Sequence, residues 1–292
     1  MNFKTIIYLV LVAAILSSCE RDLLNEEQYK NIIYIKSGDD HILTYPYQMN
    51  DAVARGYITI GSGGSLPLKE DLGIRLAVDT SSLNSYNYRV FGNEVHKYAQ
   101  LLPSRYYDAL NLDAVLQKGV ASATVAAPVD LRVSSLSPDT TYMIPIKIAS
   151  ASGAEVNPEK DFVLLAIGLE NGYSTVASRS YRMKGIKQVG AGFPSTITAT
   201  KTVLPLGNDR VRLFPENVTS SNTITDINNK AIVLVINSNN NVDILPYKNV
   251  IIEPVGTCKY DPVQKEFTLN YRYKLTAGAQ WITINENLTW ME

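Results

Sequence analysis

The sequence is poor in the residues that most often build catalytic centres, metal sites and covalent cross-links. Two cysteines, two histidines and two tryptophans are spread over 292 residues. His41 and His96 are far apart, and neither belongs to a cysteine or carboxylate pattern with metal-ligand spacing. A Gly-x-Ser-x-Gly motif is absent, and the glycines at 61, 63 and 64 lack the strand–helix context of a phosphate-binding loop. We therefore expect no catalytic residue, no metal and no cofactor.

Paired carboxylates of the kind that cleave glycosidic bonds are not evident either. Asp39 and Asp40 are the closest adjacent pair, but neighbours on a strand point to opposite faces. On a loop beside His41 they could bind a cation, although a solvated turn is the favoured interpretation. The Asn-rich stretch 237–243 lacks the regular spacing and the closing Glu of a calcium loop. The sequence thus favours a protein that is not an enzyme.

Neither sign of charge is in excess. Lys and Arg number 27 against 28 Asp and Glu, which gives a net charge of −1. No basic stripe is present, so a nucleic-acid partner is not expected. The content of 46% hydrophobic and 19% charged residues is typical of folded globular domains.

One long apolar run is present, and it lies at the N-terminus. Residues 6–16 follow the basic Lys4 and lead into Leu16-Ser17-Ser18-Cys19. This order is typical of a secretory signal peptide over residues 1–18. As a helix the run reaches only about 16 Å, and a transmembrane helix needs about 30 Å. The last four residues are similar to a bacterial lipobox, which predicts that Cys19 is lipidated and anchors the protein to the membrane. An ordinary cleaved signal with an incidental cysteine is the alternative.

Residues 19–30 are predicted to form a lipidated, flexible tether. Glu20, Asp22, Glu26 and Glu27 make it acidic, with Arg21 as an interruption. An acidic stretch after the lipidated cysteine resembles the signal that sends Bacteroidetes lipoproteins to the cell surface. The expected location is therefore the outer membrane, lipid-anchored and facing the cell surface. Cys258 is then the one cysteine left, and we expect it to be a small buried residue.

Alternating apolar residues predict strands along most of the chain. The clearest are 72–78 and 142–148, and Pro145 within the second indicates an edge strand or a bulge. Further strands are predicted at 32–35, 57–60, 131–133, 162–167, 232–236, 242–245, 267–275 and 281–284, with turns at 61–65, 137–139, 157–158, 237–241, 261–262 and 276–279. Apolar residues at helical spacing between 102 and 114 allow a short helix or turn after Pro103.

The mature chain is too long for one core, so two domains are expected. The apolar run that ends in Glu170-Asn171-Gly172 sets the boundary, giving domains at 31–170 and 171–292. The predicted fold is all-β. An N-terminal antiparallel β-sandwich is followed by a C-terminal antiparallel meander that forms a small β-barrel or sandwich.

Tyrosine is the abundant aromatic residue, with 18 Tyr against 6 Phe. Its ring packs while its hydroxyl stays solvated, which suits a sheet with one wet face, and packing is the favoured interpretation for any single ring. An aromatic ring on a loop beside Asn, Asp or Arg can also stack on a sugar. The candidate glycan-binding residues are Tyr45, Tyr47, Tyr106, Tyr107, Trp281 and Trp290.

Two groups of motifs resemble a known family. The run 102–107, Gly119, the segment 142–146 and Ser150-Ala151-Ser152-Gly153 are similar to an N-terminal domain of Bacteroidetes surface lipoproteins of unknown function. That Ig-like domain also precedes chitinase-like and lectin-like domains. Tyr260-Asp261, the segments 265–267 and 271–273, and Trp281 resemble its usual C-terminal β partner domain.

The resemblance implies an outer-membrane lipoprotein of a glycan-utilisation locus, beside a TonB-dependent transporter and its substrate-binding lipoprotein. It supplies no catalytic residues, and the acidic motif of the chitinase-like relatives is absent. The favoured hypothesis is a non-catalytic lipoprotein that binds glycans at the cell surface. A structural, adhesin-like or fimbria-like subunit that binds a protein partner is the alternative, and a hydrolase with an unrecognised site is the least favoured.

Overall fold

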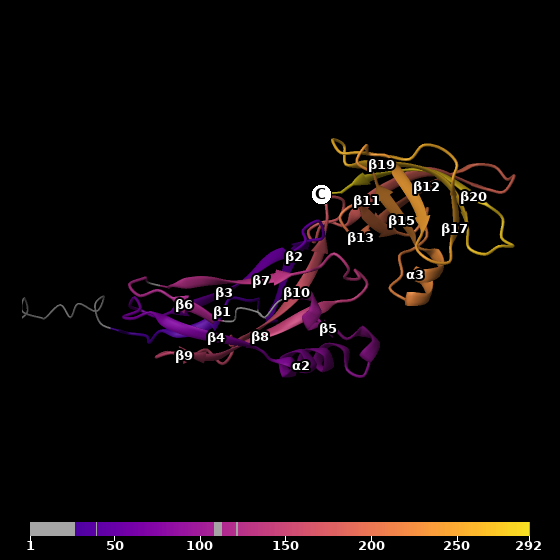
Figure 1. Cartoon of the computed structure of the whole chain (residues 1–292). Coiled ribbons are helices and arrows are strands. Elements are labelled where there is room, and N and C mark those ends of the chain that lie inside the picture. Colours follow the sequence, from indigo (N-terminus) through magenta and orange to yellow (C-terminus); the bar gives the residue numbers. More distant parts are fainter. Residues whose placement is uncertain (1–26, 39, 108–112, 121, 292) are drawn as a thin grey trace, which may run out of the picture.

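The computed structural model describes residues 27–38, 40–107, 113–120 and 122–291, and it shows two β-rich domains that lie end to end (Figure 1). The predicted signal peptide and Cys19 lie outside the described residues. Among the described helices, none has both the length and the apolar character that crossing a membrane requires.

The N-terminal domain packs two sheets against each other. One has the strand order β7-β3-β1-β9, and the other has the order β2-β10-β8-β4-β6 with β5 beside β8. Most pairs are antiparallel, but β2 with β10, β1 with β9 and β5 with β8 are parallel. The elements are β1 (Ile32–Ile35), β2 (Ile42–Gln48), β3 (Ala54–Gly63), β4 (Leu72–Val78), α2 (Thr80–Phe91), η1 (Val95–Lys97), β5 (Gln100–Leu101), η2 (Ser104–Tyr106), β6 (Asp113–Leu116), β7 (Thr124–Leu131), β8 (Tyr142–Ala151), β9 (Glu155–Val156) and β10 (Phe162–Glu170).

Pro145 predicts an edge strand or a bulge, and the edge is wrong because β8 is a central strand. The register of β8 against β4 does shift, but between Arg75 and Leu76, away from Pro145. In an extended strand the N and O of one residue point to the same side. The Pro145 carbonyl accepts a hydrogen bond from Asp79 N at 3.0 Å, just beyond the end of β4. The missing N–H of Pro145 therefore faces the end of the neighbouring strand, where the ladder stops, and the sheet tolerates the proline.

Helix α2 covers the side of β8 and β10 that faces away from the main N-terminal core. Leu83 of the helix packs with Met143, Leu164 and Ala166 in a small core on that side. Because both faces of β8 and β10 are covered, these strands are near-continuous apolar runs rather than alternating ones. The sequence pattern gave no indication of this helix.

Three local predictions differ from the structure in their details. β3 continues through Gly61 to Gly63, where a turn is predicted. A Cβ at Gly61 would meet the Tyr34 ring at 2.8 Å, so the glycine makes room for that ring. The strand predicted at 131–133 ends at Leu131. After Pro103 the chain forms one 3₁₀ turn, η2, and Ala114 lies in a strand.

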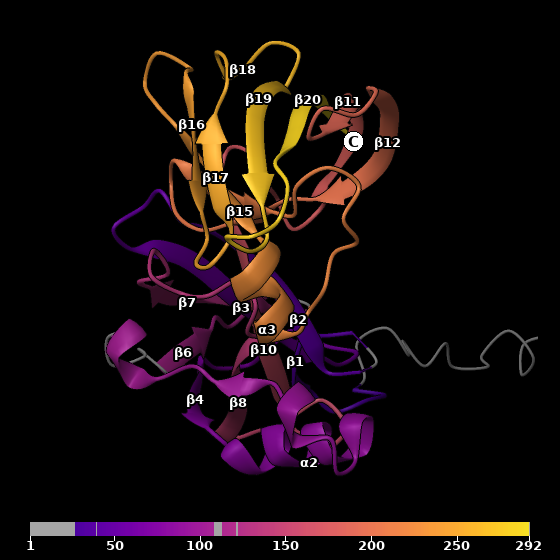
Figure 2. The same cartoon turned by 90° about the vertical axis from the view of Figure 1, so that its right-hand side faces the viewer.

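The C-terminal domain is also built from two sheets around one core. The larger sheet has the order β12-β11-β20-β19-β17 with β18 beside β19, and the smaller has the order β13-β14-β15-β16 (Figure 2). Cys258 is buried and unpaired, as predicted. The elements are β11 (Ser180–Val189), β12 (Ser195–Thr202), β13 (Leu204–Pro205), β14 (Arg210–Leu213), α3 (Ile224–Lys230), β15 (Ile232–Ile236), β16 (Val242–Pro246), β17 (Ile251–Pro254), β18 (Lys259–Asp261), β19 (Glu266–Lys274) and β20 (Ile282–Trp290).

Polar contacts hold the two domains together. Arg212 of β14 is buried and donates a hydrogen bond to the carboxylate of Asp139, which lies on the loop between β7 and β8. The Arg212 guanidinium also lies 5.8 Å and 5.7 Å from the ring centroids of Phe214 and Tyr247. Arg179 of the C-terminal domain donates from Nη2 to the carbonyl of Leu169 in β10 at 3.1 Å. The junction is thus a set of specific bonds rather than a bare linker.

Candidate functional site

The six predicted glycan-binding rings lie in separate parts of the molecule. Tyr45 and Tyr47 are two residues apart on β2, so both point to one face of the strand. Tyr47 is only 1% exposed, and its hydroxyl donates to the Val129 carbonyl at 3.4 Å. Burial raises the pKa of Tyr47 well above its usual value. The prediction that Tyr47 contacts a ligand is therefore wrong, because its ring fills the core; Tyr45 is half-buried beside it.

Tyr106 and Tyr107 are half-buried and pack against the N-terminal core. The Arg105 guanidinium lies 4.7 Å from the ring centroid of Tyr106 and donates to its hydroxyl at 3.3 Å. Hydrogen bonds from Arg105 and then Ser135 hold the pKa of Tyr106 below its usual value. Neither tyrosine presents a bare ring to solvent.

Trp281 and Trp290 lie at opposite ends of β20, about 30 Å apart along the strand. Trp281 has the parity of the outward-facing residues of β20. The Arg272 guanidinium lies 4.5 Å and the Lys274 ammonium 4.7 Å from its ring centroid. Trp290 has the parity of the inward-facing Ile284 and Leu288 and is half-buried against Tyr181, with ring centroids 5.5 Å apart, so its ring borders the outward-facing side only at the end of the strand. The two rings thus frame one strand, although they do not form a continuous platform.

The solvent-facing side of the larger C-terminal sheet runs from Trp281 to the edge of the Trp290 ring, and we call it the outer face. Alternation along β11, β12, β19 and β20 turns a set of hydroxyl, amide and charged side chains outward. Its residues between the two tryptophans are Arg182, Lys184, Thr198, Thr200, Glu266, Thr268, Asn270, Asn285, Asn287 and Thr289.

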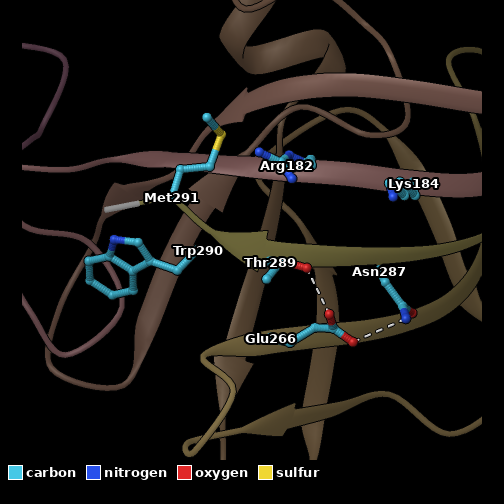
Figure 3. A pocket seen from close by; sticks show the side chains of 7 residues that line it. All are labelled: Arg182, Lys184, Glu266, Asn287, Thr289, Trp290 and Met291. Carbon is cyan, nitrogen blue, oxygen red and sulfur yellow. Dashed lines mark hydrogen bonds between the residues drawn. The ribbon is translucent and has the colours of Figure 1, made fainter.

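Cross-strand pairing sets these side chains in rows. Thr289 of β20 is directly opposite both Arg182 of β11 and Glu266 of β19, and Asn287 is opposite Lys184. Glu266 accepts from Thr289 Oγ1 at 2.7 Å and from Asn287 Nδ2 at 3.1 Å (Figure 3). These hydrogen bonds fix the hydroxyl and amide groups, which is the kind of ordered polar surface that recognises sugar hydroxyls.

A hollow of about 520 Å³ lies at the Trp290 end of the outer face. Arg182 and Lys184 line it from β11, Asn287 and Thr289 from β20, and Glu266 from β19 (Figure 3). Trp290 and Met291 close one end. The hollow therefore combines an aromatic ring with hydrogen-bonding groups and cations.

Positive charge prevails on the outer face. Arg182 and Lys184 are exposed, and neither forms an ion pair with a described carboxylate. They stand two residues apart on β11, about 7 Å along the strand. Near Trp281, Arg272 is paired with Glu253, with Nη2 2.6 Å from Oε2. The two unpaired cations at the Trp290 end are available to a ligand.

A buried charged network lies beneath this sheet and escaped the sequence analysis. Lys201 Nζ is 3.3 Å from Glu286 Oε2, and Tyr271 donates its hydroxyl proton to Glu286 Oε1 at 2.8 Å. All three side chains are almost fully buried. Burial lowers the pKa of Lys201 and raises the pKa of Tyr271. A carboxylate at 286, in phase with the inward-facing Ile284 and Leu288, is the sequence signal that could have revealed it.

Glu216 extends the network toward the domain surface. It accepts from the Tyr273 hydroxyl at 2.6 Å, and its Oε2 is 2.8 Å from Lys187 Nζ. Its backbone N–H donates to the Tyr271 hydroxyl at 3.2 Å. Burial, followed by the hydrogen bond to Glu216, raises the pKa of Tyr273 far above its usual value. The network is enclosed by the sandwich, so its role is to hold the core together rather than to meet a ligand.

The two histidines are not placed for metal binding. His41 stacks on Phe162 with ring centroids 4.2 Å apart, and His96 is exposed in η1. Asp40 caps the start of β2 by accepting from Ile42 N at 3.0 Å, whereas Asp39 lies outside the described residues. In the part of the chain that the structure describes, no group of three His, Cys, Asp or Glu side chains could hold a metal ion.

A second polar hollow, also of about 520 Å³, lies between α2 and the first residues of β2 and β10. Its charged groups largely satisfy one another. Lys147 Nζ is 3.3 Å from Asp161 Oδ2, and Asp79 accepts from Ser81 and Ser82 as the cap of α2. This hollow offers fewer free groups than the outer face.

Comparisons with known proteins agree with the two-domain architecture. A family model described as an N-terminal domain matches residues 29–155, and one described as a C-terminal domain matches residues 161–289. No curated protein matches the chain.

Solved structures from Bacteroides share the whole fold. A Bacteroides ovatus protein of unknown function has a TM-score of 0.65 at 17% identity, covering 89% of this chain and 93% of its own. A Bacteroides ovatus multidomain protein including DUF1735 has a TM-score of 0.65 at 16% identity, covering 88% and 92%. A Bacteroides thetaiotaomicron protein described as an auxiliary nutrient binding protein has a TM-score of 0.61 at 12% identity, covering 87% and 92%. The chain therefore belongs to the family of two-domain Bacteroidetes proteins that its motifs resemble, in which this N-terminal domain is followed by this C-terminal domain.

Proposed function

We propose that the protein is a non-catalytic surface lipoprotein that binds glycans on the outer face of its C-terminal sheet. The observation that carries the proposal is the row of ordered polar groups beside Trp290, where Glu266 holds Asn287 and Thr289. Sugars are recognised by several fixed donors and acceptors next to an aromatic ring. The hollow of about 520 Å³ has the size of a small-ligand site.

The likeness in fold supports a glycan-related role. One relative with the same two domains is described as an auxiliary nutrient binding protein. In this proposal the present chain has a corresponding role in nutrient capture. Lipidated Cys19 holds it at the outer membrane, beside a TonB-dependent transporter and its substrate-binding lipoprotein.

The chemistry of the outer face favours binding over hydrolysis. Glycosidases need two carboxylates that face each other across the scissile bond. On this face both oxygens of Glu266 accept hydrogen bonds from neighbouring side chains, and Glu253 is engaged by Arg272. Glu266 and Glu253 are thus occupied in holding the sheet's side chains, and Asp261 accepts from the backbone N–H groups of Val263 and Gln264.

The test is a titration of the mature chain from residue 20, without its lipid, against a broad panel of dietary and host glycans. The double variant Asn287→Ala/Thr289→Ala should weaken binding of any ligand found by about tenfold, because it removes two donors and frees Glu266. Asn217→Ala/Thr219→Ala is a matched control, since both residues are exposed on the loop after β14. Binding that the first pair leaves unchanged, or no binding across the panel, would contradict the proposal. Recovery of a stoichiometric protein partner without glycan would favour the structural or adhesin-like role instead.

A further inference from the structure

We infer that the glycan bound on the outer face is anionic, a polysaccharide whose sugars carry carboxylate or sulfate groups. This inference rests on the proposed function and names the class of ligand. Two features of the outer face lead to it, cations that lie over the aromatic rings and unpaired cations on β11, and together they give this surface a local charge opposite to that of the chain.

Cations lie over both tryptophan rings that border the outer face. Arg272 and Lys274 lie 4.5 Å and 4.7 Å from the Trp281 ring centroid, and Lys265 Nζ lies 5.1 Å from that of Trp290. A neutral sugar stacks its apolar face on a bare ring, so here it would first have to displace a cation. An acidic sugar meets the same cations as partners. The arrangement therefore favours an anionic ligand over a neutral one.

The two cations on β11 are positioned to bind acidic groups. Arg182 and Lys184 project from the same face of one strand, about 7 Å apart, and no described carboxylate pairs with either. Like charges this close repel each other, and an anion between them relieves the repulsion. Both line the hollow that contains Asn287 and Thr289. An acidic group bound by the cations would thus place the sugar hydroxyls against the amide and hydroxyl row.

The local charge is opposite to that of the whole chain. The outer face and its Trp281 end carry the cations Arg182, Lys184, Lys259, Arg272 and Lys274, while the carboxylates there are Glu266, Glu253 and Asp261. The chain as a whole has a net charge of −1. The surplus of cations is therefore a property of this surface, where it can attract a polyanion and make its binding sensitive to salt.

The experiment compares polygalacturonate with the neutral galactan made by reducing its carboxyl groups, using the mature chain from residue 20. Chondroitin sulfate is the sulfated arm, and polyglutamate tests whether charge alone suffices. We expect polygalacturonate or chondroitin sulfate to bind at least about tenfold more tightly than the neutral galactan. Added salt should weaken this binding.

Two charge-removing variants test whether the acidic glycan binds on the outer face. Arg182→Gln/Lys184→Gln should weaken binding of the acidic glycan by about tenfold or more. Lys118→Gln/Lys248→Gln removes the same charge from two exposed positions elsewhere and should change it by less than about twofold. Circular dichroism of both variants confirms that they are folded.

Each remaining outcome overturns the inference in a recognisable way. If the neutral galactan binds as tightly as both polygalacturonate and chondroitin sulfate, the ligand need not be acidic, and the proposed function then stands while the inference fails. Polyglutamate that binds as tightly as polygalacturonate shows that the surface recognises charge and not sugar. Failure of every acidic glycan refutes the inference, and the broad panel then decides whether the proposed function fails with it.

Discussion

The two domains fill their interiors in different ways. The main core of the N-terminal domain consists of apolar side chains and the ring of Tyr47, whereas the C-terminal core encloses Lys201, Glu286 and Glu216. An apolar core is held by volume and shape, and a charged core is held by partners that must all be present. The N-terminal domain should therefore respond to changes in size, and the C-terminal domain to changes in charge and pH.

The surfaces of the two domains also differ in how their charged groups are paired. In the N-terminal hollow below α2, Lys147 pairs with Asp161, and Arg89 is the one lining cation without a described carboxylate partner. The C-terminal outer face leaves Arg182 and Lys184 without a described carboxylate partner. In the proposed function the N-terminal domain has a mainly structural role and the C-terminal domain binds the ligand.

The largest effect is expected from breaking the buried network. Glu286→Ala leaves Lys201 and the Tyr271 hydroxyl buried without their acceptor, which should lower the free energy of unfolding by about 3–5 kcal/mol. Urea unfolding measures it. Lys201→Met/Glu286→Leu, which removes both charges, should recover most of the loss. A loss below about 1 kcal/mol in Glu286→Ala would contradict a stabilising role for the network.

The second-largest effect is expected from alkaline pH, which should destabilise the C-terminal domain more than the N-terminal domain. In the C-terminal domain burial raises the pKa of Tyr181, Tyr271 and Tyr273, and it raises that of Tyr260 to about 12. In the N-terminal core burial raises the pKa of Tyr47 in the same way. A raised folded-state pKa gives stability that is complete below the unfolded value near pH 10 and is lost as pH rises through the folded value.

Each such tyrosine contributes up to about 1.4 kcal/mol per pH unit in that window, so the C-terminal domain should unfold first as pH rises from 10 to 12. The lowered pKa of Lys201 makes the free energy of unfolding rise with pH up to about 10.5, the value of an unperturbed lysine. Above that pH Lys201 no longer contributes to the pH dependence. Near-ultraviolet absorbance of tyrosinate, followed with thermal unfolding, gives the order. An N-terminal domain that unfolds first would refute the contrast.

A change in size should affect the N-terminal domain. A Cβ at Gly56 would overlap the Tyr47 hydroxyl and ring, so Gly56→Ala should lower the free energy of unfolding by about 2 kcal/mol. At Gly73 a Cβ would meet Ser152 Oγ at 3.6 Å, an ordinary contact, so Gly73→Ala is the matched control with an expected change of about 0.5 kcal/mol or less. Urea unfolding measures both changes. Equal losses in the two variants would show that the close contact between Gly56 and Tyr47 does not restrict the size of the residue at position 56.

The smallest effect is expected at the junction. Asp139→Asn removes the charged partner of buried Arg212 and should cost about 1.5 kcal/mol. Because this bond joins the domains, the variant should also separate their thermal transitions in calorimetry. Asp113→Asn, which affects an exposed pair with Arg75, is the control and should leave the transitions unchanged. Unaltered coupling in Asp139→Asn would show that other contacts join the domains.

Period-two patterns predicted the all-β fold because alternation follows directly from a half-buried strand, as at Leu72–Val78. Helix α2 could not be predicted, because Asn87 occupies its buried face and uses its amide to hold both backbone groups of Ala99. That polar position removes the apolar period of a helix. The prediction of an edge strand from Pro145 was wrong for a related reason. A central strand accepts this proline because the neighbouring β4 ends beside it, and the sequence of β8 itself does not show where β4 ends.

The candidate site could be predicted in part. Composition and aromatic content led to the hypothesis of a glycan-binding surface, which stays a prediction; Trp281 has outward parity, and Trp290 borders the outer face from the core side. Tyr47 is a core residue because β2 turns that side of the strand inward. The cations beside the rings come from β19 and from the residue that precedes it, and Arg182 and Lys184 come from β11. Their proximity depends on strand order, which no local pattern encodes.

The position of a bound acidic glycan tests the central claim most directly. Backbone amide chemical shifts of the mature chain, recorded during titration with an oligogalacturonide, would locate it. We predict that the largest changes fall on Arg182, Lys184, Asn287 and Thr289. Changes confined to the hollow between α2 and β10, or spread evenly over both domains, would contradict the assignment of recognition to the outer face of the C-terminal sheet.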